Sequence, residues 1–247
     1  LQVYLSQARL PWKRASFFVA DTANGRWLSL DRNKDARLRK AFKDQTELLI
    51  RTREAAKIVG ATPLNRPEDV EIDPATRAVF VTLTNSKIKA DRYGSILKIV
   101  EKNADPLSLE FSSSVFKPGG PETGFACPDN LVFDRKGNLW MTTDISGASM
   151  HKSGYETFGN NGLFFFPLSG PHAGQSFQVA SAPKGAELTG PCFSPDGRTL
   201  FLSVQHPGEH HHARPEMESH WPDGGAAPPA PCVVAVSGPA LDAIIGD

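Results

Sequence analysis

The sequence predicts an all-β fold of the β-propeller class, because one segment pattern occurs three times along the chain. Each copy consists of an apolar strand, a tight turn rich in Asp, Gly or Pro, and a second apolar strand. The copies cover residues 66–84, 127–144 and 189–203. Their turns begin at Asp73, Asp134 and Ser194, at intervals of about 60 residues. A hairpin repeated at such a period is typical of propeller blades.

The charge, hydrophobic content and cysteine content of the chain argue against several classes of function. The 247 residues include 27 basic and 27 acidic side chains, so no net charge attracts the chain to nucleic acid or to an anionic membrane. Hydrophobic residues make up 40%, but none of the apolar runs reaches the roughly 20 residues that a membrane span requires. Three cysteines without a Cys-x-x-Cys pair indicate neither a disulfide framework nor a zinc ribbon.

Other elements follow from local patterns. Asn24-Gly25 lies between two apolar runs, residues 16–21 and 26–30, and predicts a hairpin. Between residues 36 and 59 the apolar residues recur at helical spacing, which predicts one or two inserted helices with Gly60 as the stop. Three more apolar runs are expected to be strands, at residues 95–100, 162–167 and 232–236.

Two long segments lack a regular pattern, residues 146–161 and 206–231. Irregular segments of this length are often functional in compact domains. The run His210 to His212 allows two interpretations, a metal-binding cluster or a solvated loop.

The candidate site consists of polar residues at the ends of the repeated strands. Glu68, Asp129 and Thr189 enter the three hairpins at positions that we take as equivalent, so they should converge near the propeller axis. Asp144 and Glu209 follow outgoing strands. Carboxylates grouped in this way favour hard cations, Ca²⁺ before Zn²⁺. By contrast, the turn residues Asp73, Asp134 and Asp196 are expected to bond their own backbone.

Several of these segments resemble the PhoX family of bacterial alkaline phosphatases, over roughly residues 17–236. The similar stretches are Arg66 to Asp69, Phe80 to Asn85, Leu139 to Asp144 and Gly190 to Glu209. The occurrence of Arg66 to Asp69 and Gly190 to Glu209 in this order is fairly specific to the family. The Ser-Pro-Asp-Gly piece at residues 194–197, by contrast, occurs in many propellers.

The resemblance implies an exported, periplasmic or secreted phosphatase that hydrolyses small phosphate monoesters with calcium and iron ions on the propeller axis. It implies metal binding by four carboxylates, Glu68, Glu209, Asp129 and Asp144. It implies substrate binding by Arg66, Asn85 and His206, although Asn at a strand end is also a common turn former. Neither a nucleic-acid partner nor a membrane span is expected.

The chain also departs from the family pattern. Family members are much longer, and their N-terminal half contributes a Cys and carboxylates to the iron site in a motif that has no match here. We therefore expect a single propeller domain over residues 1–247, the C-terminal portion of a five- to six-bladed propeller. A missing N-terminal half, or another chain, would then pair with its open strand edges. Two alternatives remain, a calcium-dependent propeller lactonase or arylesterase, and a non-catalytic propeller that acts as a binding or assembly subunit.

Overall fold

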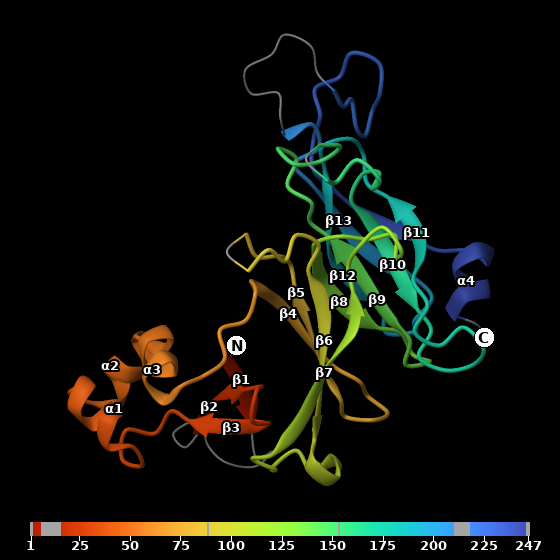
Figure 1. Cartoon of the computed structure of the whole chain (residues 1–247). Coiled ribbons are helices and arrows are strands. Elements are labelled where there is room, and N and C mark those ends of the chain that lie inside the picture. The colour runs from red at the N-terminus through yellow and green to blue at the C-terminus, as the bar shows by residue number, and fades with distance from the viewer. Residues whose placement is uncertain (1, 6–15, 88, 153, 210–217, 246–247) are drawn as a thin grey trace. The chain divides into compact units, whose positions relative to one another are not determined.

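The computed structural model describes residues 2–5, 16–87, 89–152, 154–209 and 218–245 (Figure 1). Within these ranges the strands form four antiparallel sheets and helices are few, so the all-β prediction is confirmed. Blade 1 contains β4 (Pro67–Ile72), β5 (Val79–Leu83), β6 (Ser95–Glu101) and β7 (Phe111–Pro118). Blade 2 contains β8 (Pro128–Phe133), β9 (Leu139–Thr143), β10 (Gly162–Phe166) and β11 (Phe177–Ser181). Blade 3 contains β12 (Glu187–Phe193), β13 (Leu200–Gln205) and β14 (Cys232–Val236).

The chain separates into two compact units. Unit 1 consists of Leu1–Leu64, Thr76–Ala78 and Ile99–Ser114, and unit 2 consists of Asn65–Ala75, Val79–Lys98 and Val115–Asp247. The three predicted repeat hairpins, β4–β5, β8–β9 and β12–β13, are all confirmed. Apart from residues 76–78 at the tip of the first hairpin, they belong to unit 2.

Unit 1 holds the fourth sheet, β1 (Gln2–Leu5), β2 (Ser16–Asp21) and β3 (Arg26–Ser29), and three short helices. The helices are α1 (Ala36–Ala41), α2 (Gln45–Ile50) and α3 (Thr52–Val59), where the sequence predicted one or two. The extra break arises because the Asp44 side chain caps α2 by accepting a hydrogen bond from the Glu47 N–H. Gly60 ends α3 at φ 93°, as predicted.

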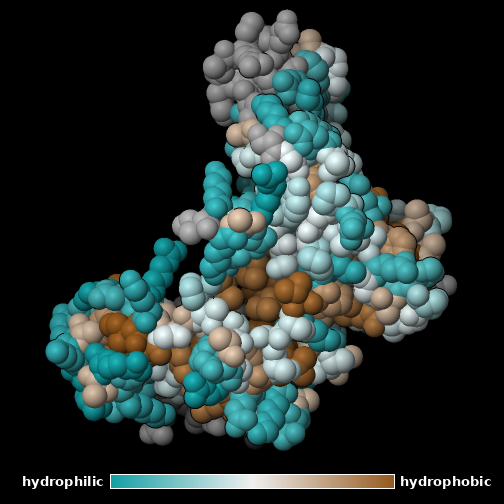
Figure 2. All heavy atoms as spheres, in the orientation of Figure 1, coloured by the Kyte–Doolittle hydropathy of each residue, from teal (hydrophilic) through white to brown (hydrophobic). Residues whose placement is uncertain are grey.

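The helices pack a small core against the sheet in unit 1. Leu38, Leu48 and Ala55 are fully buried and contact Val19 and Leu30. Hydrophilic side chains cover most of the helical segment, which lies at the lower left of Figure 2. The buried apolar residues of the three helices therefore pack on the β2–β3 hairpin, as is general for amphipathic helices.

Blades 2 and 3 share the main core of unit 2. Trp140 and Leu163 from blade 2 pack against Leu188, Leu200 and Leu202 from blade 3, and each of these side chains is buried. A helix that the sequence analysis missed, α4 (Pro239–Ile245), contributes Leu241 and Ile245 to the same core. The strands β7 and β11 were also missed.

A β-bulge interrupts the first strand of each repeat, and it lies one residue nearer the turn in blade 3 than in blades 1 and 2. The pairing register shifts between Pro67 and Val70 in β4, between Pro128 and Leu131 in β8, and between Thr189 and Cys192 in β12. Two residues therefore bulge in each blade, and the first of them is Glu68, Asp129 or Gly190. Thr189, which was predicted to be equivalent to Glu68 and Asp129, pairs with Ser203 and so lies just before the bulge of blade 3 instead of within it.

Candidate functional site

In blades 1 and 2 the second bulge residue ties its blade to the next one within unit 2. The Asp69 carboxylate in β4 accepts a hydrogen bond from the Leu131 N–H in β8 at 2.8 Å. In the same way, the Asn130 side-chain oxygen in β8 accepts from the Gly190 N–H in β12 at 2.9 Å. These two bonds hold neighbouring bulges side by side, and the first of them brings the bulge that contains Glu68 close to the bulge that contains Asp129.

The carboxylates at the bulges form a concentrated negative charge. Burial raises the pKa of Asp129 to about 6, and the charges of Asp144, Glu68 and Asp69 add to this effect. Arg66 opposes the shift but does not cancel it. Beyond the effect of burial, three neighbouring carboxylates raise the pKa of Asp129 and Arg66 lowers it.

A further carboxylate, Glu187, extends the cluster into blade 3. Its side chain is buried, hydrogen bonds to Asp144, and has a pKa well above the usual range because of burial and the Asp144 charge. His206 lies beside it, with Nε2 3.5 Å from the Glu187 carboxylate and Nδ1 3.7 Å from the Glu209 carboxylate. The second distance exceeds hydrogen-bond length, and within the described residues His206 Nδ1 is buried without a hydrogen-bond partner.

The predicted substrate-binding residues Arg66 and Asn85 lie beside Glu68. The Arg66 guanidinium is 3.2 Å from the Glu68 carboxylate and donates to the Asn85 side-chain oxygen at 3.4 Å. The Asn85 amide in turn donates to the Cys127 sulfur at 3.4 Å, and that sulfur lies 3.7 Å from the Tyr155 hydroxyl. Because burial raises the pKa of the Cys127 thiol, it stays protonated at neutral pH and acts as a support for Asn85.

Backbone strain is concentrated in the same region. Arg66 and Cys127 occupy equivalent positions before the bulge prolines and have φ values of 46° and 55°, and His206 has a φ of 38°. Positive φ values cost free energy in residues other than glycine and persist where the surroundings enforce them. Here the surrounding contacts hold three residues of the cluster in such conformations.

The structure thus links all seven predicted site residues in one network of neighbours. It runs from Asn85 through Arg66 and Glu68 to the remaining four, Asp129, Asp144, His206 and Glu209. In the described ranges, however, no three His, Cys, Asp or Glu side chains are arranged to hold one metal ion. The assignment of metal ligands therefore stays a prediction. The triplet His210 to His212 lies outside the described residues.

Sequence reasoning missed Glu187. An acidic residue between Ala186 and Leu188, at the start of an apolar strand, was the available signal. The turn residues behave as predicted, since Asp73, Asp134 and Asp196 accept hydrogen bonds from backbone N–H groups two residues further on. The three cysteines are free, as expected.

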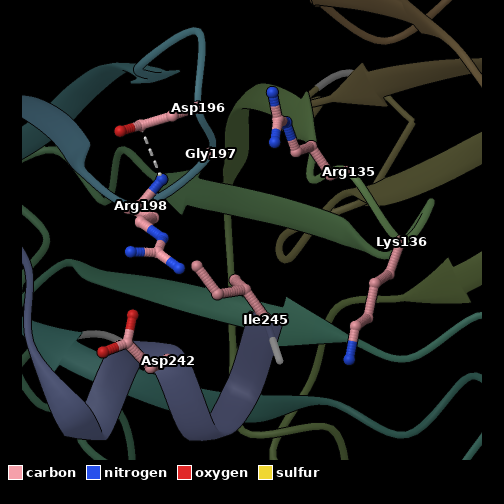
Figure 3. Close-up of a pocket in the computed structure, with 7 residues that line it drawn as sticks. All are labelled: Arg135, Lys136, Asp196, Gly197, Arg198, Asp242 and Ile245. Carbon is pink, nitrogen blue, oxygen red and sulfur yellow. Dashed lines mark hydrogen bonds between the residues drawn. The ribbon is translucent and has the colours of Figure 1, made fainter. Parts of the chain in front are cut away.

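A separate pocket of about 320 Å³ lies at the other end of the hairpins (Figure 3). The residues that line it are Arg135, Lys136, Asp196, Gly197, Arg198, Asp242 and Ile245. They come from the β8–β9 turn, the β12–β13 turn and α4, whereas the carboxylate cluster lies where the hairpins begin and end. Its lining mixes both signs of charge, and the Arg135 guanidinium already donates to the Pro195 carbonyl. We assign it no role.

The carboxylate cluster contains ligand atoms of the kind that cations bind, although no three of its described side chains are arranged around one ion. Several carboxylates share a partly buried site, where the charges of Asp144, Glu68 and Asp69 raise the pKa of Asp129 and Arg66 lowers it. Within the described residues His206 Nδ1 has no hydrogen-bond partner, so this nitrogen is a further atom that could bind a metal ion. Oxygen ligands of this kind suit hard metal ions, and such ions would offset the charge repulsion that adds to the effect of burial on the pKa of Asp129.

Successive four- and three-stranded antiparallel blades, with an acidic cluster where their first hairpins begin and end, define a class of protein, the β-propellers with an acidic site. Comparison with known proteins then identifies the family. A family model described as alkaline phosphatase PhoX matches residues 8–208, so the chain belongs to the PhoX family. No curated protein sequence matches the chain.

A solved structure also resembles the chain. It is Pseudomonas fluorescens PhoX in complex with vanadate, a transition-state analogue, with a TM-score of 0.80 and 26% sequence identity. The similarity covers 95% of this chain and 48% of that chain, so this chain spans about half the length of that relative. The likeness confirms the β-propeller prediction. Within the described residues, no helix is both long and apolar enough to cross a membrane.

Proposed function

We propose that this chain is a metal-dependent phosphatase that hydrolyses phosphate monoesters at the carboxylate cluster. Its membership of the PhoX family, whose members depend on metal ions, supports the reaction class. The observation that carries the proposal is the convergence of Glu68, Asp129, Asp144 and Glu187 on a site with unbalanced negative charge. An anionic substrate would be repelled by these side chains alone, so the site requires cations.

The chain's own residues divide into two groups. Glu68, Asp129, Asp144 and Glu209 would hold calcium and iron ions, with Glu187 as an additional candidate beside Asp144. When bound, such ions neutralise phosphoryl oxygens and lower the pKa of a coordinated water. The protein residues then bind and orient the substrate and do not attack it themselves.

Beside Glu68, Arg66 would bind the phosphate group. Its guanidinium is more than half exposed and is held by Glu68 and Asn85, so it can donate to phosphate oxygens without losing its support. Asn85 would fix the plane of the guanidinium, and His206 would lie at the blade 3 side of the substrate. The family resemblance further supports a periplasmic or secreted location in a bacterium.

The experiment is hydrolysis of a chromogenic phosphomonoester by this chain, with added Ca²⁺ and Fe³⁺ and then with a chelator. We expect turnover with the metals and its loss with the chelator. Turnover that is independent of metal would contradict the proposal, as would metal binding without any turnover.

Matched variants test the assignment of residues. Glu68→Ala and Glu209→Ala are each expected to weaken metal binding measured by calorimetry, whereas Asp196→Ala should leave it unchanged. Asp196 is an acidic residue of the same repeat whose carboxylate only closes a turn. Equal effects of all three substitutions would refute the assignment of Glu68 and Glu209 as ligands.

A further inference from the structure

A row of four hydrogen bonds runs from Arg66 into the interior of unit 2. The Arg66 guanidinium donates to the Asn85 side-chain oxygen at 3.4 Å, and the Asn85 amide donates to the Cys127 sulfur at 3.4 Å. The Cys127 thiol donates to the Tyr155 hydroxyl at 3.7 Å, and that hydroxyl donates to the Arg92 carbonyl at 2.5 Å. Because each group donates to the next one, the row has a single direction.

The direction of the row decides which end of the Asn85 amide faces Arg66. A side-chain amide has an oxygen that accepts and a nitrogen that donates, whereas a guanidinium only donates. Because the Cys127 sulfur accepts from the amide nitrogen, the amide oxygen is left facing the guanidinium. The reversed amide would place its donors against the donors of Arg66. The acceptor at Cys127 therefore selects the orientation in which Asn85 can hold Arg66.

The inner end of the row lies in a packed cluster. Cys127 and Tyr155 are buried, and the Tyr93 ring packs against this cluster. The centroid of the Tyr93 ring lies 5.8 Å from that of Tyr155 and 5.4 Å from that of Phe158. Tyr155 and Phe158 belong to residues 146–161, one of the two irregular segments of the sequence. The described part of this segment therefore supplies the hydroxyl that accepts from the thiol.

We propose that Cys127 and Tyr155 are positioning residues, which orient the Asn85 amide and thereby aim the Arg66 guanidinium at the phosphate group of the substrate. The inference rests on the proposed function, in which Arg66 binds that group. Without this support the guanidinium keeps its contact with Glu68 at 3.2 Å but loses a fixed second partner. It could then rotate about the remaining contact, so its donors would no longer be held in the plane that a phosphate requires.

The mobility of the Arg66 side chain tests the proposal without any need for turnover. Cys127→Val keeps an apolar side chain of similar size but removes the acceptor. In the protein without added metal, nitrogen relaxation should show the order parameter of the Arg66 Nε–H falling to about 0.6 or below. Cys127→Ser restores an acceptor and a donor, and should keep the wild-type value. Cys232→Val is the matched control, because the Cys232 sulfur also accepts an N–H, from Trp221 at 3.2 Å, but lies on β14.

A second variant separates positioning from folding. Tyr155→Phe keeps the ring that packs on Tyr93 and removes only the hydroxyl. The thiol hydrogen then loses its acceptor and competes with the Asn85 amide, so Arg66 should again be less ordered. Wild-type order at Arg66 in Tyr155→Phe, or in a folded Cys127→Val, would overturn the proposal. If circular dichroism shows that Cys127→Val does not fold, Tyr155→Phe decides alone.

Kinetics with a chromogenic phosphomonoester and added Ca²⁺ and Fe³⁺ provide a separate readout. Cys127→Val should raise KM about ten-fold and leave kcat nearly unchanged, because a phosphate contact made equally in the ground state and the transition state contributes to binding alone. A fall in kcat at constant KM would overturn the positioning role. A wild-type protein without turnover would instead contradict the proposed function, and the order parameter of Arg66 would still decide whether Cys127 and Tyr155 position it.

Discussion

Replacement of Asp134 by Ala tests how the blade turns hold the hairpins that carry the site. The Asp134 carboxylate is buried and accepts four hydrogen bonds. Three come from Lys136 N–H at 2.9 Å, Asn138 N–H at 2.9 Å and the Asn138 side-chain amide at 3.1 Å. The fourth comes from the Trp140 indole N–H at 3.0 Å. One side chain therefore joins the turn to the core residue that packs blade 2 on blade 3.

The loss of stability in Asp134→Ala follows from the hydrogen-bond donors that lose the Asp134 carboxylate as their acceptor. Lys136 is exposed and its N–H can turn to water, but the Asn138 N–H and the Trp140 indole N–H are buried. A buried donor without a partner costs about 1–3 kcal/mol, so the two together suggest a loss of about 3 kcal/mol. For a chain of this length that corresponds to a fall in melting temperature of roughly 6–12 °C.

Thermal unfolding followed by circular dichroism measures the effect. Asp134→Asn should lie between wild type and Asp134→Ala, because its amide oxygen replaces only part of the acceptor capacity. Asp196→Ala removes the turn carboxylate of blade 3, which is exposed, and is expected to change the melting temperature much less. If Asp134→Ala melts at the wild-type temperature, the buried hydrogen bonds do not stabilise the hairpin and the reasoning fails.

Three further predictions concern other parts of the chain. Asn130→Ala removes the acceptor that ties blade 2 to Gly190 and should cost about 1–2 kcal/mol in unfolding experiments, so unchanged stability would contradict the role of this tie. Gly197→Ala should destabilise the chain more than Gly137→Ala, because both glycines have positive φ but only at Gly197 would a Cβ meet a side chain, at 2.7 Å. Burial raises the pKa of Glu101, so its folded form holds the proton more tightly than the unfolded form, and stability should fall as the pH rises from about 4.5 through the raised pKa. Melting curves at pH 5 and pH 7 should show that Glu101→Gln flattens this dependence, and an equal slope in both proteins would exclude Glu101 as its source.

The repeat hairpins could be predicted because each combines two apolar strands with a turn whose Asp bonds its own backbone. The edge strands β7 and β11 could not, since most of their residues are exposed or half-buried and show little apolar alternation. The place of Thr189 just outside the bulge of blade 3 could not be predicted, because a β-bulge shifts the register without leaving a mark in the spacing of apolar residues. The seven predicted site residues come together because they flank repeated strands, but Glu187 required a view of the folded chain.

Glycine at position 190 explains why Glu187 matters. In blades 1 and 2 the first bulge residue is acidic, Glu68 or Asp129, but in blade 3 that position is Gly190, with φ 59° and no side chain. Blade 3 nevertheless contributes negative charge, because Glu187 reaches Asp144 from the start of the same strand. The repeat thus provides the backbone frame in all three blades, while the third blade supplies its carboxylate from a different position. The backbone of the site therefore repeats from blade to blade, but its side chains do not. Blade 3 contributes the imidazole of His206 beside Glu187, whereas blade 1 contributes the guanidinium of Arg66 beside Glu68.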